Sequence, residues 1–289
     1  MSSQSPNPAT RISRRFEELR QTGDLGLVAY ITAGNPSLDA TRRIVLAAAE
    51  AGADIIELGV PFSDPLADGP VIQRASERAL KSGTTLGGVL DLVREIRQQS
   101  QVPLVLFTYF NPVLQLGLDT FAARAQSAGA DGALITDLPP EDSADYRAAL
   151  RSCGLDTIFL AAPTTGDERM RHIASVSTGF LYVISRTGVT GERDSLADDL
   201  PALLRRARNA TTLPLAVGFG ISLPGHVSVL GGLADAAVVG SALVAEIERA
   251  RSAEDAASNV AARIRLLKQA GLRGMSRREA AAAERGRDS

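Results

Sequence analysis

Short apolar runs alternate with longer amphipathic segments along most of this chain. Eight apolar runs have the length of a strand, and a segment with helical periodicity follows each of them. The runs are residues 27–32, 54–59, 103–108, 132–136, 157–161, 180–184, 213–217 and 236–239. Repeated strand–helix units are typical of parallel sheets, because parallel neighbours need long crossover connections. Eight units in about 250 residues predict an α/β fold of the TIM (β/α)8 type, with a doubly wound open sheet as the alternative.

The helical segments have recognisable starting points. They begin near Ser37, Val71, Leu118, Glu141, Asp167, Ala197, Pro224 and Ser241, and the second of them continues from Thr85. Residues 12–20 predict an extra helix ahead of the first strand. Residues 1–10 are polar with two prolines, and 271–289 mix arginines and acidic residues with an alanine run. We therefore expect a single catalytic barrel over 11–270, between a disordered N-terminal segment and a loose, charged C-terminal extension.

Composition excludes several classes of protein. The 289 residues are 45% hydrophobic with a net charge of −2, which is enough for a sizeable core. No apolar stretch reaches the roughly 18 residues of a membrane span, and no secretory pattern opens the chain, so we expect a cytoplasmic protein. A near-neutral chain without tryptophan offers no basic, aromatic surface for nucleic acid. The single cysteine, Cys153, is expected to be an inert thiol.

One carboxylate interrupts the second apolar run, DIIELGV at 54–60. A charge in a buried strand is costly unless it is paired or its pKa rises, and this makes Glu57 a candidate for chemistry. Eleven residues later, Asp68 stands in a loop rich in proline and glycine, PFSDPLADGP at 61–70. Two carboxyls in contrasting environments are typical of a general acid/base pair. The alternatives are a strand carboxylate capped by loop N–H groups and a turn-forming aspartate.

Polar residues and glycines gather where the predicted strands end, which is where barrels of this type carry their chemistry. They are Tyr109, Asn111, Asp137, Thr164, residues 185–191, residues 218–222 (GFGIS), Gly240 and Ser241. Glycines after both the seventh and eighth strands favour a phosphate site made of backbone N–H groups and a helix N-terminus. The alternative is that these glycines only make tight turns.

The scarcity of lysine and histidine argues against two common kinds of catalytic site. The two lysines, Lys81 and Lys268, fall in predicted helices away from the strand ends, which argues against Schiff-base chemistry. The two histidines, His172 and His226, have no neighbouring ligand pattern, which argues against zinc and suggests surface or packing roles. We predict no metal.

The chain resembles the tryptophan synthase alpha chain family over residues 16–268. The matching motifs are ITAGNP, ELGVPFSDPLADGP, TYFNPV, DLPPEDS, YVISRTGVTG, GFGIS and GSALV, in the expected order. The resemblance implies retro-aldol cleavage of indole-3-glycerol phosphate to indole and glyceraldehyde 3-phosphate, with no cofactor in this chain. It also implies transfer of indole through a tunnel to a beta subunit, which carries pyridoxal phosphate and makes L-tryptophan within an alpha2beta2 heterotetramer. The alternatives are a stand-alone lyase that releases free indole, a weakly catalytic paralogue acting as an allosteric partner, and a different phosphate-binding barrel isomerase.

The resemblance also assigns roles to individual residues. Glu57 matches the family's catalytic glutamate and would protonate indole C3, then take the proton of the side-chain hydroxyl. Asp68 matches the catalytic aspartate and would accept the indole N–H as positive charge develops on that nitrogen. Tyr109 and Tyr182 match tyrosines of the substrate site. The phosphate is expected at Gly191, Gly218, Phe219, Gly220, Gly240 and Ser241.

Two loops, 61–70 and 185–199, are expected to move during turnover. Arg186 and Thr190 match the family in the second loop, and we hypothesise that Thr190, also expected at the substrate, links this lid to Asp68.

The resemblance predicts contacts with the beta subunit at Asp64, Asn111 and Pro139, although such residues are also ordinary turn formers. Two residues depart from the family pattern. Asn35 stands where aspartate is usual and is expected to weaken a loop hydrogen bond, and Tyr30 replaces the phenylalanine that some members have at the indole pocket.

Overall fold

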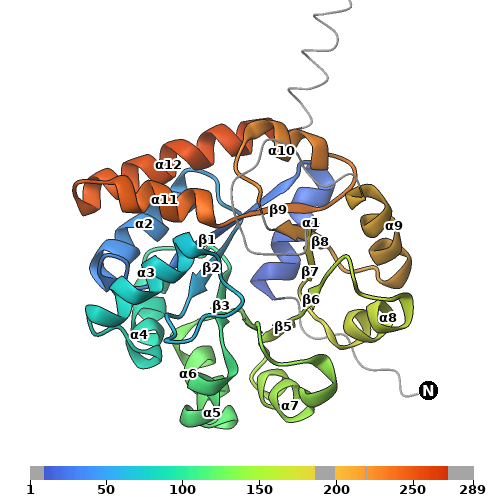
Figure 1. Ribbon diagram of the computed structural model, residues 1–289, viewed down its shortest axis with the longest axis horizontal. Coiled ribbons are helices and arrows are strands. Elements are labelled where there is room, and N and C mark those ends of the chain that lie inside the picture. The colour runs from blue at the N-terminus through green and yellow to red at the C-terminus, as the bar shows by residue number, and fades with distance from the viewer. Residues whose placement is uncertain (1–9, 186–198, 219, 273–289) are drawn as a thin grey trace, which may run out of the picture.

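A computed structural model describes residues 10–185, 199–218 and 220–272, and its parallel strands form the predicted barrel inside a ring of helices (Figure 1). The strands are β1 (Gly26–Thr32), β2 (Ile55–Gly59), β3 (Leu104–Thr108), β4 (Gly132–Ile135), β5 (Asp156–Ile158), β6 (Leu160–Ala161), β7 (Leu181–Ile184), β8 (Leu215–Gly218) and β9 (Ala236–Val239). Their order in the sheet is β5-β4-β3-β2-β1-β9-β8-β7-β6. The fold class predicted from the alternating pattern is confirmed.

The barrel closes at one segment of the chain, which pairs with a different neighbouring strand in each of its halves. The fifth predicted strand, 157–161, divides at Phe159 into β5, which pairs with β4, and β6, which pairs with β7. The carbonyl of Phe159 accepts a hydrogen bond from the N–H of Tyr182 at 3.2 Å. The described part of the chain therefore has nine strands where eight were expected, because one segment changes partners halfway along.

Helices surround the strands and largely begin where the sequence predicted. They are α1 (Arg11–Thr22), α2 (Leu38–Glu50), α3 (Pro70–Lys81), α4 (Leu86–Arg97), α5 (Phe110–Leu116), α6 (Leu118–Ala128), α7 (Ala144–Ser152), α8 (Asp167–Val176), α9 (Leu200–Ala210), α10 (Pro224–Leu230), α11 (Ser241–Arg249) and α12 (Ala253–Ala270), with a 3₁₀ turn η1 (Pro140–Asp142). Ser37 and Thr85 cap α2 and α4 with their side-chain oxygens. None of the described helices is long and apolar enough to cross a membrane.

Three helices differ from the prediction. The helix expected near Glu141 begins at Ala144, because residues 140–142 form the separate turn η1. Helix α5 was not predicted; only Val113 of its seven residues is buried, so its sequence shows no amphipathic period. Helix α12 was not predicted as a separate element. The start expected near Ala197 lies outside the described residues, as do nearly all of the two terminal segments.

Two apolar layers hold the barrel together. One lies between the strands and the helices, and the other fills the barrel interior. The interior layer takes every second residue of the strands, including Val28, Tyr30, Ile55, Val105, Phe107, Leu134, Tyr182, Ala216, Ala236 and Val238. Because both faces of each strand are buried, the strands read as nearly continuous apolar runs.

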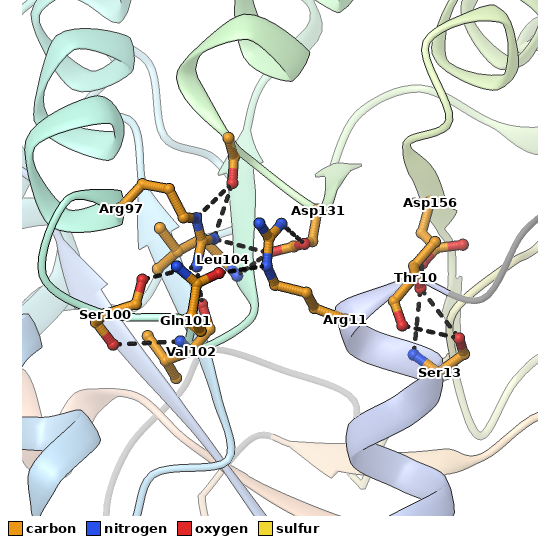
Figure 2. Close-up of polar contacts among 11 residues, drawn as sticks. Thr10, Arg11, Ser13, Arg97, Ser100, Gln101, Val102, Leu104, Asp131 and Asp156 are labelled. Carbon is orange, nitrogen blue, oxygen red and sulfur yellow. Dashed lines mark hydrogen bonds and ion pairs between the residues drawn. The ribbon is translucent and has the colours of Figure 1, made fainter.

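Helix α1 closes the end of the barrel where the strands begin. Its buried side chains Ile12, Phe16 and Leu19 belong to the interior layer. Around them, Arg11 pairs with Asp131 at 2.9 Å, and the Thr10 hydroxyl donates to Asp156 at 2.6 Å (Figure 2). Polar groups at this end are thereby paired with one another, which is typical of the stability face of such barrels.

A recurring aspartate joins neighbouring strands at the same end. Asp54 and Asp131 each end an AGAD segment directly before a strand. Each accepts a backbone N–H from the adjacent strand: Asp54 from Leu27 at 2.6 Å, and Asp131 from Leu104 at 2.8 Å (Figure 2). Asp131 also pairs with Arg97 at 2.9 Å. These buried carboxylates are satisfied by nearby hydrogen-bond donors and cations. Their role is therefore structural, unlike that of the carboxyls at the opposite end of the barrel.

Candidate active site

Glu57 lies on β2 and projects into the barrel. It has the same parity as Ile55, an interior residue, and it stands between Tyr30 of β1 and Val105 of β3 in the strand register. Its side chain is fully buried, and neither carboxyl oxygen has a hydrogen-bond partner among the residues that the structure describes. Burial alone raises the pKa of Glu57 to about 8, because the charged form loses its hydration. Near pH 7 the carboxyl is therefore mainly protonated and able to donate a proton.

Asp68 lies in the loop between β2 and α3 and is partly buried. The Tyr109 hydroxyl donates to its Oδ2 at 3.1 Å and accepts the N–H of Ala67 at 3.1 Å. The ring of Phe62 stacks on Tyr109 with 5.0 Å between centroids. Burial raises the pKa of Asp68 to about 6, and the Tyr109 hydrogen bond opposes that rise. Near pH 7 Asp68 is mainly ionised, opposite in state to Glu57.

Both carboxyls line the same pocket, which has a volume of about 580 Å³ when its part open to solvent is included. Apolar walls come from Phe107, Tyr182 and Val238, which end the interior layer at this edge of the barrel. Such a combination of apolar walls with a few polar groups is typical of a site for a small organic ligand.

The same pocket is bordered by the start of α11. Gly240 is the N-cap of this helix, and Ser241 is its first residue. The first N–H groups of a helix have no partner within the helix, and with the helix dipole they favour a bound anion. Gly220 also lines the pocket and adopts a positive φ of 92°, a conformation that favours glycine. The geometry therefore suits a ligand that joins an apolar ring to a phosphate.

The structure separates the predicted phosphate residues into three groups. Gly220, Gly240 and Ser241 line the pocket. Gly218 does not line it, and the reason for glycine there is steric, because a Cβ would lie 2.1 Å from the Tyr182 hydroxyl. Three predicted substrate residues lie outside the described residues, as does the lid residue Arg186. The three are Thr190, Gly191 and Phe219.

Several lining residues were missed by the sequence analysis. They include Ile72, Phe107 and Val238. Phe107 and Val238 carried a usable signal, because each follows an interior residue by two positions, as Glu57 does. Ile72 carried none, since it comes from the first turn of a helix that only the tertiary fold brings to the pocket.

The histidines and lysines lie away from the acid pair. His226 is buried, and its Nδ1 accepts the N–H of the pocket residue Ser222 at 3.3 Å. Of the two expected roles, surface or packing, it therefore has the packing role. His172 is exposed on α8. Lys268 pairs with Asp54 at the closed end of the barrel, and Lys81 is exposed at the end of α3. Neither lysine can reach the pocket to form a Schiff base there.

Comparison with known proteins decides the family. The family profile described as "Tryptophan synthase alpha chain" matches residues 16–271. The chain belongs to the tryptophan synthase alpha chain family. The tryptophan synthase alpha chain of Solibacter usitatus is 56% identical over 251 residues, which cover 87% of this chain and 93% of the relative. That of Citrifermentans bemidjiense is 51% identical and covers 85% of this chain and 92% of the relative.

Solved structures agree with the family. The alpha subunit of tryptophan synthase from Legionella pneumophila matches with a TM-score of 0.82 at 39% identity, over 91% of this chain and 98% of that chain. A structure of Mycobacterium tuberculosis tryptophan synthase matches with a TM-score of 0.84 at 33% identity, over 92% and 99% of the two chains. As a tryptophan synthase alpha chain, the protein is a carbon–carbon lyase of tryptophan biosynthesis that cleaves indole-3-glycerol phosphate. The stand-alone lyase is not favoured by these matches.

The departure at Asn35 leaves two hydrogen-bond donors without acceptors. Arg78 Nε donates to Asn35 Oδ1 at 3.0 Å, but Arg78 Nη2 and Asn35 Nδ2 are both buried and have no partner within the described part of the chain. Asparagine presents one acceptor and one donor to a guanidinium that offers two donors. An aspartate would accept both, as a bidentate pair.

We therefore expect Asn35→Asp to stabilise the fold. The free energy of unfolding should rise by about 1.5–3 kcal/mol, the usual contribution of a hydrogen bond to a charged group. Urea unfolding monitored by circular dichroism measures the change. The matched control is Asn259→Asp on the exposed face of α12, expected to stay within about 0.5 kcal/mol of the parent. An Asn35→Asp protein that is no more stable than the parent would contradict this explanation.

Proposed function

We propose that Glu57 and Asp68 are the acid/base pair with which this chain cleaves indole-3-glycerol phosphate. The observation that carries the proposal is that both carboxyls line the same pocket, with the pKa of Glu57 raised to about 8 and that of Asp68 to about 6. At pH 7 one group holds a proton to give and the other holds a charge that accepts a hydrogen bond. The reaction needs both a proton donor and a negatively charged hydrogen-bond acceptor.

The proposed steps follow from the bond that breaks. Protonated Glu57 donates its proton to indole C3, and the ring nitrogen becomes positively charged. Asp68 accepts the N–H of that nitrogen, a contact that strengthens as the charge develops. The electrons of the bond between C3 and the glycerol chain then return to the ring. The Glu57 carboxylate removes the proton of the adjacent hydroxyl, which becomes the aldehyde of glyceraldehyde 3-phosphate, and the proton balance is restored.

The rest of the pocket would orient the substrate. Tyr30, Phe107 and Tyr182 would enclose the indole ring, and Gly220 with the start of α11 at Ser241 would hold the phosphate, which is supported by their places around the pocket. Tyr109 would act mainly by holding Asp68. We keep Thr190, Gly191 and Phe219 in the proposed site on the family resemblance alone.

We further infer that indole passes to a beta subunit, which alone carries pyridoxal phosphate, in a cytoplasmic alpha2beta2 tetramer. Support comes from apolar side chains exposed on the loop that follows β2 and on helix α5, which follows β3. Leu66 is 93% exposed and Leu114 is 55% exposed, and exposed apolar side chains grouped at one face favour a protein partner. The predicted contact residues Asp64, Asn111 and Pro139 are exposed as well.

An assay of indole release tests the proposed function. The purified chain is given indole-3-glycerol phosphate, alone and with a tryptophan synthase beta subunit and its serine substrate. We expect cleavage by the chain alone, faster cleavage with the beta subunit, and tryptophan in place of free indole. A full rate of indole release that the beta subunit does not change would favour the stand-alone lyase, and no cleavage in either mixture would refute the assignment.

A further inference from the structure

The first turn of α3 holds the backbone of the loop that carries Asp68. The side-chain amide of Gln73 donates from Nε2 to the carbonyl of Asp68 at 2.8 Å and to that of Pro65 at 3.4 Å. These two carbonyls lie at the two ends of one turn, which the N–H of Asp68 closes by bonding to the Pro65 carbonyl at 3.0 Å. One side chain therefore binds the turn at both ends.

Tyr109 also holds the turn. Its hydroxyl binds both the Asp68 carboxylate and the N–H of Ala67. The apolar side chains of the turn contribute little, because Leu66 is 93% exposed and Ala67 is exposed as well. The position of Asp68 thus depends on polar contacts, from Tyr109 after β3 and from Gln73 on α3.

The residues beside Gln73 explain why α3 is a firm support. Ile72 is buried and lines the pocket. Arg74 forms two hydrogen bonds with Glu248 of α11, at 3.1 and 2.9 Å, and Arg78 adds a third at 3.0 Å. Helix α11 is the one whose first residue borders the pocket at Ser241. A single turn of α3 is therefore fixed to the pocket wall, to the Asp68 loop and to the proposed phosphate helix.

We propose that Gln73 is a positioning residue for Asp68. The proposal rests on the proposed role of Asp68, and Gln73 itself touches no reacting atom. A neutral amide suits the task, because it donates two hydrogen bonds without changing the charge near Asp68. Misplacement of a catalytic group by about 1 Å can cost on the order of 10²-fold in rate, so the loss of these two bonds should be visible in turnover.

A double-mutant cycle tests the proposal in the full-length chain. Gln73→Met keeps the length of the side chain and its helix propensity but removes the donors. We expect it to lower kcat/KM for indole-3-glycerol phosphate by about 10- to 100-fold, by the same misplacement reasoning. In an Asp68→Asn background it should cost less than about threefold, because residues that act through one another are not additive. Gln126→Met, exposed on α6, is the control and should stay within about twofold.

Two results would overturn the proposal in distinguishable ways. If Asp68→Asn leaves cleavage unchanged, the role of Asp68 fails and that of Gln73 fails with it. If Asp68→Asn is slow but Gln73→Met costs the same factor in both backgrounds, or costs nothing, only the role of Gln73 fails.

A second variant gives a readout that a purely structural role would not move. Gln73→Glu keeps the shape but places a negative charge against two carbonyl oxygens and near Asp68. The pKa of Asp68 should rise, and the acidic limb of the profile of kcat/KM against pH should move to higher pH. The other titratable neighbours of Asp68, namely Glu57, Tyr30, Tyr109 and Tyr182, are the same in both proteins. A limb that stays in place in a folded Gln73→Glu protein would argue against the proposal.

Discussion

Glu57→Gln is expected to lower kcat for cleavage of indole-3-glycerol phosphate by about 10²- to 10⁴-fold at pH 7, the usual range for a general acid/base group. The amide fills the same space, but it can neither donate a proton to indole C3 nor take one from the hydroxyl. In the parent protein kcat/KM should fall as pH rises through about 8, where Glu57 loses its proton. The variant's residual activity should lack that limb. Single-turnover assays of indole formation across pH 5–9 measure both effects.

The same substitution has an expected signature in stability that separates chemistry from damage to the fold. The pKa of Glu57 is raised from 4.5 to about 8 by burial, so the folded state holds a proton that the unfolded state has released. The parent's free energy of unfolding should therefore fall between pH 4.5 and 8 and then level off. Glu57→Gln carries no such penalty, so its stability relative to the parent should grow across that window.

Urea unfolding at pH 5 and pH 8 checks this expectation. Glu50→Gln, on the exposed face of α2, is the control and should show no such gain at the higher pH. A Glu57→Gln protein that cleaves at the parent rate would remove Glu57 from the mechanism. One that is inactive and also less stable at both pH values would point to a structural role instead.

Asp68→Asn should also slow cleavage by about 10²- to 10⁴-fold. The amide keeps the size and the contact with Tyr109 but lacks the charge that, in the proposed mechanism, stabilises the positive ring nitrogen. In the parent, kcat/KM should rise with pH through about 6 as Asp68 ionises. Together with the Glu57 limb this predicts a bell-shaped profile with its maximum near pH 7. The rising limb should be missing in Asp68→Asn. Its persistence at the same pH would assign it to another group.

Much of the fold was readable from local patterns, for identifiable reasons. Strands buried on both faces appear as nearly continuous apolar runs, and helices that cover them keep a 3.6-residue period, so the repeat of units was visible. Ser37 and Thr85 indicated the starts of two helices, because their hydroxyls satisfy otherwise unpaired N–H groups there. The division of the fifth strand at Phe159 was not visible, because it depends on which neighbours each half meets when the barrel closes.

The sequence by itself determined that a carboxyl interrupts a buried strand, that a second follows in a loop, and that glycines end two later strands. Those are properties of residue types at fixed spacings. Only the tertiary structure decided that Glu57 has no hydrogen-bond partner among the described residues, while Asp68 has Tyr109, 41 positions along the chain. It also decided that Gln73 binds the turn that carries Asp68. Proton affinity depends on the solvent and partners around each group, and those are set by how distant segments pack, which no local spacing encodes.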